Sequence, residues 1–362
     1  MPVEALKAAE ASLAKQVTSN AQEQYVLALM LNGDYPRAEA YVQAHQLNQS
    51  NLLFTVKLQQ LSQKILNAVQ FYQSSSYRNE GEKAFYPLDA VLAEMKALSA
   101  ELPEQADLQR RFYYEYIDAL NQRNRSKEVL LVAQQLNMNP QEMPAYVRHA
   151  IADAYLKLQQ PAKAEPLYLS LFKEKNYVDY SVYAGLYYAY IEQEKFKQAN
   201  QLFQEMDKTL PTFRYSDAKG VEPTTHPDRL GYLSLKGLNY AYRNQHAKAE
   251  QYFQNLVEHA PSNVAFQNNL ALIQRWREKP LLAEHTVSQW NGMTPISQTT
   301  QINQMQNAQT LGDIERWRAI NHYLYQTVPD DTAVQRSRKE LNDREHFSIQ
   351  HSSTWSESKS DQ

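Results

Sequence analysis

Hydrophobic positions along most of the chain follow the pattern of helices rather than that of strands. The stretches 57–72 (KLQQLSQKILNAVQFY) and 87–102 (PLDAVLAEMKALSAEL) are long, rich in Leu, Ala, Lys and Gln, and contain no Gly. Such segments are typical of amphipathic helices. The short apolar runs between Gly-bearing turns that a parallel sheet needs do not occur in the sequence. The pattern therefore predicts an all-α protein.

One short motif recurs among the predicted helices, a small Ala followed four residues later by an aromatic or apolar residue. Its clearest copies are KAEPLY (163–168), QANQLF (198–203), KAEQYF (248–253) and LAEHTV (282–287). The four alanines of these copies are separated by 35, 50 and 34 residues. A tetratricopeptide repeat has a period of about 34 residues.

Proline supports the same repeat. Pro211, Pro261 and Pro295 each follow the Ala of their copy by twelve residues, and a proline there ends a helix at little cost. A helix pair of this kind cannot bury its own apolar face, so several pairs must stack. The sequence therefore predicts a tetratricopeptide-type repeat superhelical solenoid, and the 50-residue spacing predicts one repeat with an insertion.

Weaker copies extend the array in both directions. Residues 27–41 match the motif well, whereas Trp317 occupies the small-residue position 34 residues after Ala283. We expect that last repeat to pack more loosely or differently, as terminal capping repeats do. Residues 1–345 are thus predicted to form the solenoid, less regular at 52–103. The insertion at 213–230 is either a functional loop or a tolerated surface insertion.

Charge and composition exclude several classes of function. The formal net charge of −3 and pI near 6.3 leave no basic field for a phosphate backbone, so nucleic acid is not an expected partner. The chain has no Cys, which fits an oxidising compartment such as the periplasm. The His residues are dispersed and no Gly-x-Ser-x-Gly turn or Gly-rich phosphate loop occurs. We therefore expect no enzyme, no metal and no cofactor.

Tyrosine is the most unusual part of the composition, with 25 residues. In repeats of this kind the first helix of each pair lines the concave surface, and the residues one position after the small packed residue or three before it face the groove. Reading along the first helices in this way gives the ligand-binding candidates Tyr114, Asp118, His149, Asp153, Tyr188, Glu192 and Tyr242. Tyrosine rings stack on sugar faces and carboxylates pair with ammonium groups, so the pattern suits an amino sugar. Ordinary surface polarity is the alternative explanation.

The two ends of the chain carry a different signal. Met1–Glu4 lacks the basic segment and apolar run of a secretion signal, so we expect a cytosolic chain or a fragment of a longer one. In residues 346–362, Phe347, Ile349 and Trp355 alternate with small polar residues. This period of two resembles the first strand of an outer-membrane barrel, which needs about 9–11 residues. A flexible polar tail is the alternative.

Together these features resemble the periplasmic part of the poly-β-1,6-N-acetyl-D-glucosamine (PNAG) export porins. The resemblance rests on the repeats, the insertion at 213–230, the last repeat with Trp317 and the strand-like segment at 346–362. It implies a periplasmic, non-enzymatic helical array attached to an outer-membrane barrel in the same parent chain. The array would guide partly deacetylated poly-N-acetylglucosamine to the pore and dock a periplasmic polysaccharide deacetylase, a role in biofilm export.

Two alternatives remain open. One is a general tetratricopeptide protein–protein interaction scaffold, such as a chaperone or assembly adaptor whose groove binds a peptide tail. The other is the equivalent domain of a cellulose or alginate exporter. A peptide-tail clamp would place Lys, Arg and Asn along the groove, whereas the candidates here are mostly Tyr and acidic residues. That composition favours a sugar.

Overall fold

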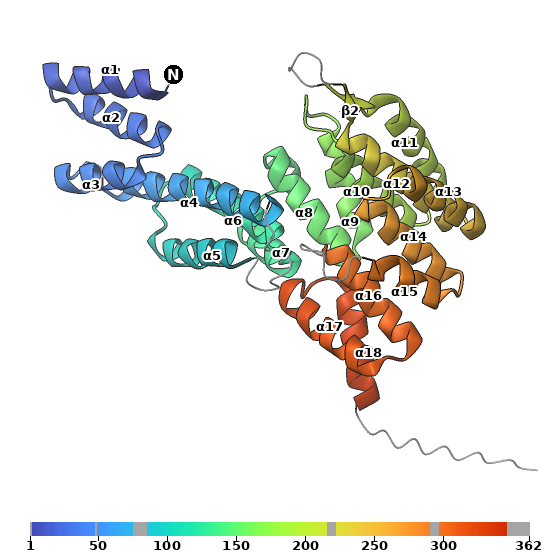
Figure 1. Cartoon of the computed structure of the whole chain (residues 1–362). Helices are drawn as coiled ribbons and strands as arrows, with labels where there is room; N and C mark the ends of the chain where they lie inside the picture. Colours follow the sequence, from blue (N-terminus) through green and yellow to red (C-terminus); the bar gives the residue numbers. More distant parts are fainter. Residues whose placement is uncertain (1, 48, 75–84, 216–221, 290–296, 346–362) are drawn as a thin grey trace, which may run out of the picture.

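The computed structural model consists almost entirely of α-helices stacked in pairs (Figure 1). It describes residues 2–47, 49–74, 85–215, 222–289 and 297–345. The predicted all-α, tetratricopeptide-type solenoid is confirmed. The strand-like segment expected at 346–362 lies outside the described residues.

The first helices form an arm that extends to one side of the molecule (Figure 1). The arm comprises α1 (Pro2–Lys15), α2 (Ser19–Leu31), α3 (Tyr35–His45), α4 (Gln49–Ser74), α5 (Tyr86–Leu98) and the 3-10 turn η3 (Ser99–Glu101). A small core around Val26, Leu29 and Val42 holds its first part together. Within 52–103 the structure places the long helix α4 and the shorter α5.

The rest of the chain forms stacked helix pairs that curve into a compact body. The pairs are α6 (Ala106–Gln122) with α7 (Ser126–Gln135), α8 (Ala145–Lys157) with α9 (Pro161–Leu171), α10 (Tyr180–Glu192) with α11 (Phe196–Thr209), α12 (Pro227–Tyr242) with α13 (His246–His259), α14 (Val264–Trp276) with α15 (Pro280–Ser288), and α16 (Gln298–Leu311) with α17 (Ile314–Thr327). The short turn η4 (Pro140–Glu142) precedes α8, and α18 (Thr332–Glu345) packs on α17 and α16. Each first helix contacts the first helix of the next pair, so the first helices form one continuous layer.

The turn inside each pair has the same backbone form. One residue of the turn adopts a left-handed conformation, and these residues are Gly33, Asn124, Gln159, Glu194, Asn244, Glu278 and Gly312. A residue with a side chain carries a cost of about 1–2 kcal/mol in this conformation. Because Gln159, Glu194 and Glu278 tolerate it, the packing of the helices that they join must offset this cost.

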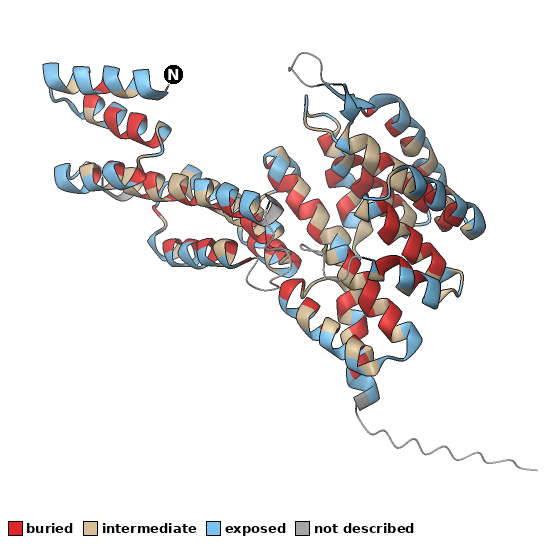
Figure 2. Ribbon diagram, in the orientation of Figure 1, coloured by how far each residue is buried: buried red, intermediate tan, exposed pale blue. Residues whose placement is uncertain are grey.

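Small residues stand where paired helices approach most closely, as the repeat motif predicts. Ala164, Ala199, Ala249 and Ala283 are buried, with at most 2% of their surface exposed. Glycine has the same role on α10, since a Cβ added at Gly185 would lie under 3.0 Å from the Tyr168 ring. Buried residues accordingly concentrate where helices face one another (Figure 2).

The last repeat accommodates Trp317 in a different way. Its side chain is fully buried, and the indole Nε1 donates a hydrogen bond of 2.6 Å to the Ser337 hydroxyl on α18. Small Ser337 and Val334 on α18 leave room for the indole, so α18 covers a residue too large for the usual slot. The repeat packs differently, as the sequence predicts.

The insertion at 213–230 contains a small antiparallel ribbon. Strands β1 (Phe213–Arg214) and β2 (Thr224–Thr225) pair with Phe213 opposite Thr225, and all four residues are exposed. The next residues lead into α12, whose first position is Pro227. The insertion therefore projects from the stack without interrupting it (Figure 1).

The first and last pairs of the body touch each other, which closes one superhelical turn. The Arg123 guanidinium donates a hydrogen bond of 2.7 Å to the Thr327 carbonyl, and the Lys127 main-chain N–H donates one of 3.1 Å to the Asp330 carboxylate. Arg123 is only 4% exposed and also pairs with Asp89 on α5. We call the Arg123–Thr327 and Lys127–Asp330 interactions the closure contact.

Candidate functional site

The layer of first helices is the concave side of the turn. Lys157 at the end of α8 and Gln298 at the start of α16 line the same cavity of about 240 Å³, although the seven helices α9 to α15 lie between these positions in the chain. Helices so far apart in sequence can share a cavity only if their layer curves towards itself. The first helices, which carry the groove residues predicted from the sequence, therefore form a layer that curves inward.

Three of the predicted carboxylates lie on consecutive first helices, Asp118 on α6, Asp153 on α8 and Glu192 on α10. We call them the carboxylate row. Tyrosine hydroxyls lie between them. Burial raises the pKa of Tyr177 to about 12, with the charges of Asp179, Asp153 and Asp118 adding to the effect in that order. Burial also raises the pKa of Tyr168, with Asp153 and Glu192 adding to it. Each tyrosine therefore lies within electrostatic reach of two members of the row.

Asp153 is the most firmly held member of the carboxylate row. The Tyr168 hydroxyl donates a hydrogen bond of 2.6 Å to its carboxylate. His149 stands one turn earlier on α8, with Nε2 3.6 Å from the same carboxylate and Nδ1 3.3 Å from the Tyr177 hydroxyl. The structure thus brings the predicted pair His149 and Asp153 together. A carboxylate positioned in this way can accept a further donor from a ligand without first reorganising.

The outer members of the row are partly desolvated. Burial raises the pKa of Asp118, an effect opposed by the hydrogen bond from Gln122. Burial also raises the pKa of Glu192. In the described part of the chain no Lys or Arg pairs with either carboxylate. A partly desolvated carboxylate without a counter-ion gains from any cation that reaches it.

Aromatic side chains continue the wall beyond Glu192. Tyr188 and Tyr242 meet edge to face with ring centres 6.3 Å apart, and Tyr242 lies 6.0 Å from the Trp276 ring. Trp276 is 40% exposed and is also 6.0 Å from the His246 ring. Trp276 is not among the predicted groove residues, because it stands five residues after the packed Ala271, outside the positions that the spacing rule selects.

Tyr114 differs from the other candidates in what its hydroxyl contacts. Its ring is half-buried against the main core, and its hydroxyl lies 3.8 Å from the Met138 sulfur. Tyr146, which the sequence rule did not select, presents its hydroxyl to the wall and donates 3.3 Å to the Glu115 carboxylate. Burial, together with the charges of Glu115 and Asp118, raises the pKa of Tyr146. Tyr146 therefore lies within electrostatic reach of Asp118.

Past Tyr188 the concave wall opens into a cavity of about 480 Å³ between α10, α12, α14 and α16. We call it the neutral pocket, because its polar lining consists of hydroxyls and amides and none of its lining residues is charged. The polar residues are Tyr180, Tyr188, Ser234, Asn268, Asn269, Ser297 and Thr299. Tyr188 and Glu192 lie one turn apart on α10, so this cavity and the carboxylate row adjoin.

A polar layer joins α14 and α16, two of the helices that line the neutral pocket. The Arg275 guanidinium donates hydrogen bonds of 3.1 and 3.0 Å to the side-chain oxygens of Asn303 and Asn307, and a third to Gln306. Its partners are all neutral, and burial lowers the pKa of Arg275 to about 10. The hydrogen bonds of this layer stabilise the contact between two repeats. Removing the Arg275 cation from water opposes part of that stabilisation.

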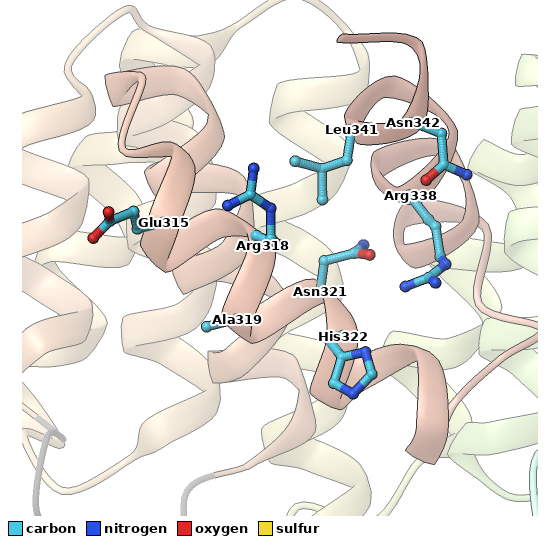
Figure 3. A pocket seen from close by; sticks show the side chains of 8 residues that line it. All are labelled: Glu315, Arg318, Ala319, Asn321, His322, Arg338, Leu341 and Asn342. Atoms are coloured by element: carbon cyan, nitrogen blue, oxygen red, sulfur yellow. The ribbon is translucent and has the colours of Figure 1, made fainter. Parts of the chain in front are cut away.

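A separate pocket of about 540 Å³ lies between α17 and α18. Figure 3 shows Arg318, Asn321 and His322 on α17 and Arg338 on the facing helix. The Arg338 guanidinium also lies 4.5 Å from the centre of the Tyr325 ring. The carboxylate of Glu315 also lines this pocket, and none of the candidates predicted from the sequence does.

Among residues 2–47, 49–74, 85–215, 222–289 and 297–345, no group of three or more His, Asp or Glu side chains is arranged to hold a metal ion. In the same ranges, every helix is too short or too polar to cross a lipid bilayer.

No known family model matches the chain. Two curated relatives align with 271 residues at 26% identity, covering 72% of this chain and 33% of each relative; both are named poly-β-1,6-N-acetyl-D-glucosamine export protein, from Escherichia coli K12 and Escherichia coli O157:H7. This chain is similar to part of the PNAG export protein. It spans about a third of the length of the export proteins that it matches.

Solved structures similar to the chain include other helical repeat proteins. A tetratricopeptide repeat protein from Parabacteroides merdae aligns with a TM-score of 0.48 at 14% identity, over 77% of this chain and 99% of its own. The apo form of the quorum sensor NprR from B. thuringiensis aligns with a TM-score of 0.46 at 11% identity, over 90% of this chain and 98% of its own. Sequence similarity to the PNAG export protein and the helical repeats of the chain itself agree on a tetratricopeptide-type domain.

Proposed function

We propose that the chain is a non-catalytic scaffold in exopolysaccharide export, which holds partly deacetylated poly-N-acetylglucosamine along its concave wall. In this proposal the domain works in the periplasm, is attached to an outer-membrane barrel in its parent protein, and docks the deacetylase that modifies the polymer. Similarity to part of the PNAG export protein supports a role in exopolysaccharide export. The carboxylate row supports a partly deacetylated, and therefore cationic, polymer as the ligand.

The carboxylate row matches the chemistry of a deacetylated amino sugar. Each glucosamine unit carries an ammonium group, which can pair with Asp118, Asp153 or Glu192. The faces of the sugar rings are apolar and stack on exposed aromatic rings such as Trp276. A row of similar sites on successive repeats suits a polymer, because units of one chain can engage neighbouring sites together.

Each contact contributes little by itself. Exposed ion pairs contribute about 0–1 kcal/mol and weaken with salt. A polymer held by several such contacts can bind and still move from site to site, as a guide for transport requires. We therefore expect modest affinity for short oligomers, increasing with their length and decreasing with ionic strength.

Titration calorimetry with β-1,6-linked glucosamine hexamers tests the proposal. The double variant Asp153→Asn, Glu192→Gln should lower the affinity about three- to ten-fold, which corresponds to two weak ion pairs. The matched control is Glu23→Gln, Glu258→Gln, which removes the same charge from exposed helix positions outside the groove. It should leave the affinity unchanged.

Two outcomes would contradict the proposed function. One is a wild-type chain that binds no glucosamine or N-acetylglucosamine oligomer. The other is a double variant that binds the glucosamine hexamer as tightly as the wild type does. Capture of a peptide tail in place of sugar would instead support the general interaction scaffold.

A further inference from the structure

We infer that the neutral pocket is a subsite for an N-acetylated, uncharged sugar unit, placed beside the carboxylate row that takes the cationic units. The inference rests on the proposed function and names the part of the polymer that this cavity would take. The concave wall would then have two chemically distinct parts, the neutral pocket for acetylated units and the carboxylate row for cationic units.

The lining of the neutral pocket fits an acetamido group better than an ammonium group. The cavity of about 480 Å³ is lined by Tyr180, Ser234 and Thr299, which carry hydroxyls, by Asn269, which carries an amide, and by apolar residues such as Ala265. An ammonium group would lose water there and find no opposite charge, which is costly. An acetamide needs one acceptor, one donor and an apolar surface for its methyl group, and this lining offers all three.

The floor of the pocket is held in place before any ligand binds. Asn268 is 3% exposed, and its amide donates 2.9 Å to the Thr300 hydroxyl. The Asn303 amide donates 3.2 Å to the Asn268 carbonyl. Buried amides that are already hydrogen-bonded do not reorganise cheaply. The floor is therefore a rigid surface against which a sugar can be oriented.

The wall formed by Tyr180 depends on a glycine. A Cβ added at Gly231 on α12 would lie under 3.0 Å from ring carbons of Tyr180. Glycine at this position lets the ring lie directly on the α12 backbone and form one side of the cavity. A ring fixed in this way is suited to stack on a sugar, since it loses little freedom on binding.

The tyrosine hydroxyls at the pocket remain neutral and available. Burial raises the pKa of Tyr180 to about 12 and that of Tyr188 well above its ordinary value, and repulsion from the Tyr242 phenolate, which itself forms only at high pH, adds to both effects. Neither hydroxyl has a hydrogen-bond partner among the described residues. Both can therefore donate to, or accept from, a polar group of a bound sugar.

The neutral pocket lies next to the carboxylate row. Tyr188 borders it, and Glu192 lies one helical turn further on the same face of α10, at about 5–6 Å between Cβ atoms. An acetylated unit in the pocket thus places the following units beside the carboxylates. We expect an oligomer that contains both kinds of unit to bind more tightly than an oligomer of either kind alone.

The experiment compares fully acetylated and fully deacetylated β-1,6-linked hexamers on the whole chain by titration calorimetry. Ser234→Leu fills the pocket and should weaken the acetylated hexamer about ten-fold, the effect of losing roughly 1.4 kcal/mol, while the deacetylated hexamer binds as before. Asn269→Asp adds a charge without changing size and should weaken the acetylated hexamer while strengthening the deacetylated one. Asn255→Asp makes the same substitution at an exposed position of α13 and should alter neither.

Retained binding of the deacetylated hexamer shows that each variant is folded, so misfolding cannot imitate the expected result. The inference is overturned if the wild type binds both hexamers and the pocket variants change both affinities equally or not at all; the proposed function then stands without this subsite. If the wild type binds neither hexamer, the proposed function itself fails and this inference fails with it.

Discussion

The guanidinium of Arg123, at the end of α6, donates a hydrogen bond of 2.7 Å to the main-chain carbonyl of Thr327, which lies 204 residues further along the chain. The same guanidinium pairs with Asp89 at 2.7 Å and lies 4.1 Å from the centre of the Phe85 ring. One buried cation therefore joins the arm, the first pair of the body and the last pair. Repeat arrays usually lack such contacts, because each repeat touches only its neighbours.

Removing this cation should open the turn. We expect Arg123→Met to lower the free energy of unfolding by about 2–4 kcal/mol, since it leaves the Asp89 carboxylate partly buried without its main partner. Small-angle X-ray scattering should show a larger radius of gyration. Arg125→Met is the matched control, because Arg125 also lies 3.5 Å from Asp89 and is 37% exposed. It should cost less than about 1 kcal/mol and leave the scattering unchanged; equal effects of the two variants would refute the role of the closure contact.

Gly185 connects the packing of the repeats to the carboxylate row. Gly185→Ala should destabilise the chain by about 1–3 kcal/mol through overpacking against Tyr168, although Ala is the better helix former. Because the displaced ring carries the hydroxyl that holds Asp153, binding of glucosamine oligomers should weaken as well. Chemical denaturation and calorimetry measure the two effects. Tyr168→Phe, which keeps the ring and loses only the hydrogen bond, should weaken binding with a smaller loss of stability.

The neutral partners of Arg275 offer a stabilising substitution. Gln306→Glu would give the buried guanidinium a carboxylate of nearly the same shape in place of an amide oxygen. Hydrogen bonds between charged groups are about twice as strong as neutral ones, so we expect a gain of about 1 kcal/mol in the free energy of unfolding. In an Arg275→Gln background the same substitution should give no gain. A gain that persists there would mean that the effect does not come from this pair.

Asp118 should make stability depend on pH. Its pKa is raised in the folded state by burial, so folding favours its protonated form. The stability from this group is therefore present below the ordinary carboxyl pKa of about 3.9 and is lost as the pH rises through the raised value. Asp118→Asn should melt at a higher temperature than the wild type at pH 7, and the difference should vanish towards pH 4.

The exposed carboxylate Asp343 provides the comparison for this measurement. Asp343→Asn should not change the melting temperature at either pH. A wild-type melting temperature above that of Asp118→Asn at pH 7 would mean that Asp118 is stabilised by a partner. The expected result would also mean that the groove retains a carboxylate that lowers stability, which is common where a residue serves binding.

The repeat and much of the concave wall could be predicted because both depend on local spacing. Asp153 directly follows the packed Ala152, and Asp118 stands 35 residues before Asp153, about one repeat period. Tyr188 stands 35 residues after Asp153, and Glu192 lies one helical turn beyond Tyr188. The spacing rule for groove residues does not select Tyr177, because Tyr177 lies in the loop before α10. It does not select Trp276 either, because Trp276 is the last residue of α14.

The closure contact and the neutral pocket have no local signal at all. Each depends on how small rotations between repeats add up along the body. Arg123 and Thr327 are ordinary residues in the sequence, and only the summed rotation brings them together. The pocket likewise requires four first helices at their actual distances, together with Gly231, whose lack of a side chain matters only because the Tyr180 ring lies against it.

The closure contact also limits how this array can change in size. An open solenoid gains or loses a unit cheaply, because only two interfaces are affected. Here the deletion of α12 and α13 would remove one step of rotation and carry Thr327 out of reach of Arg123. Inserted residues preserve the closure contact only where they leave the rotation between successive helix pairs unchanged, as the ribbon of β1 and β2 does. The body therefore has a fixed repeat number, like a ring, and evolution can lengthen its loops far more readily than its circumference.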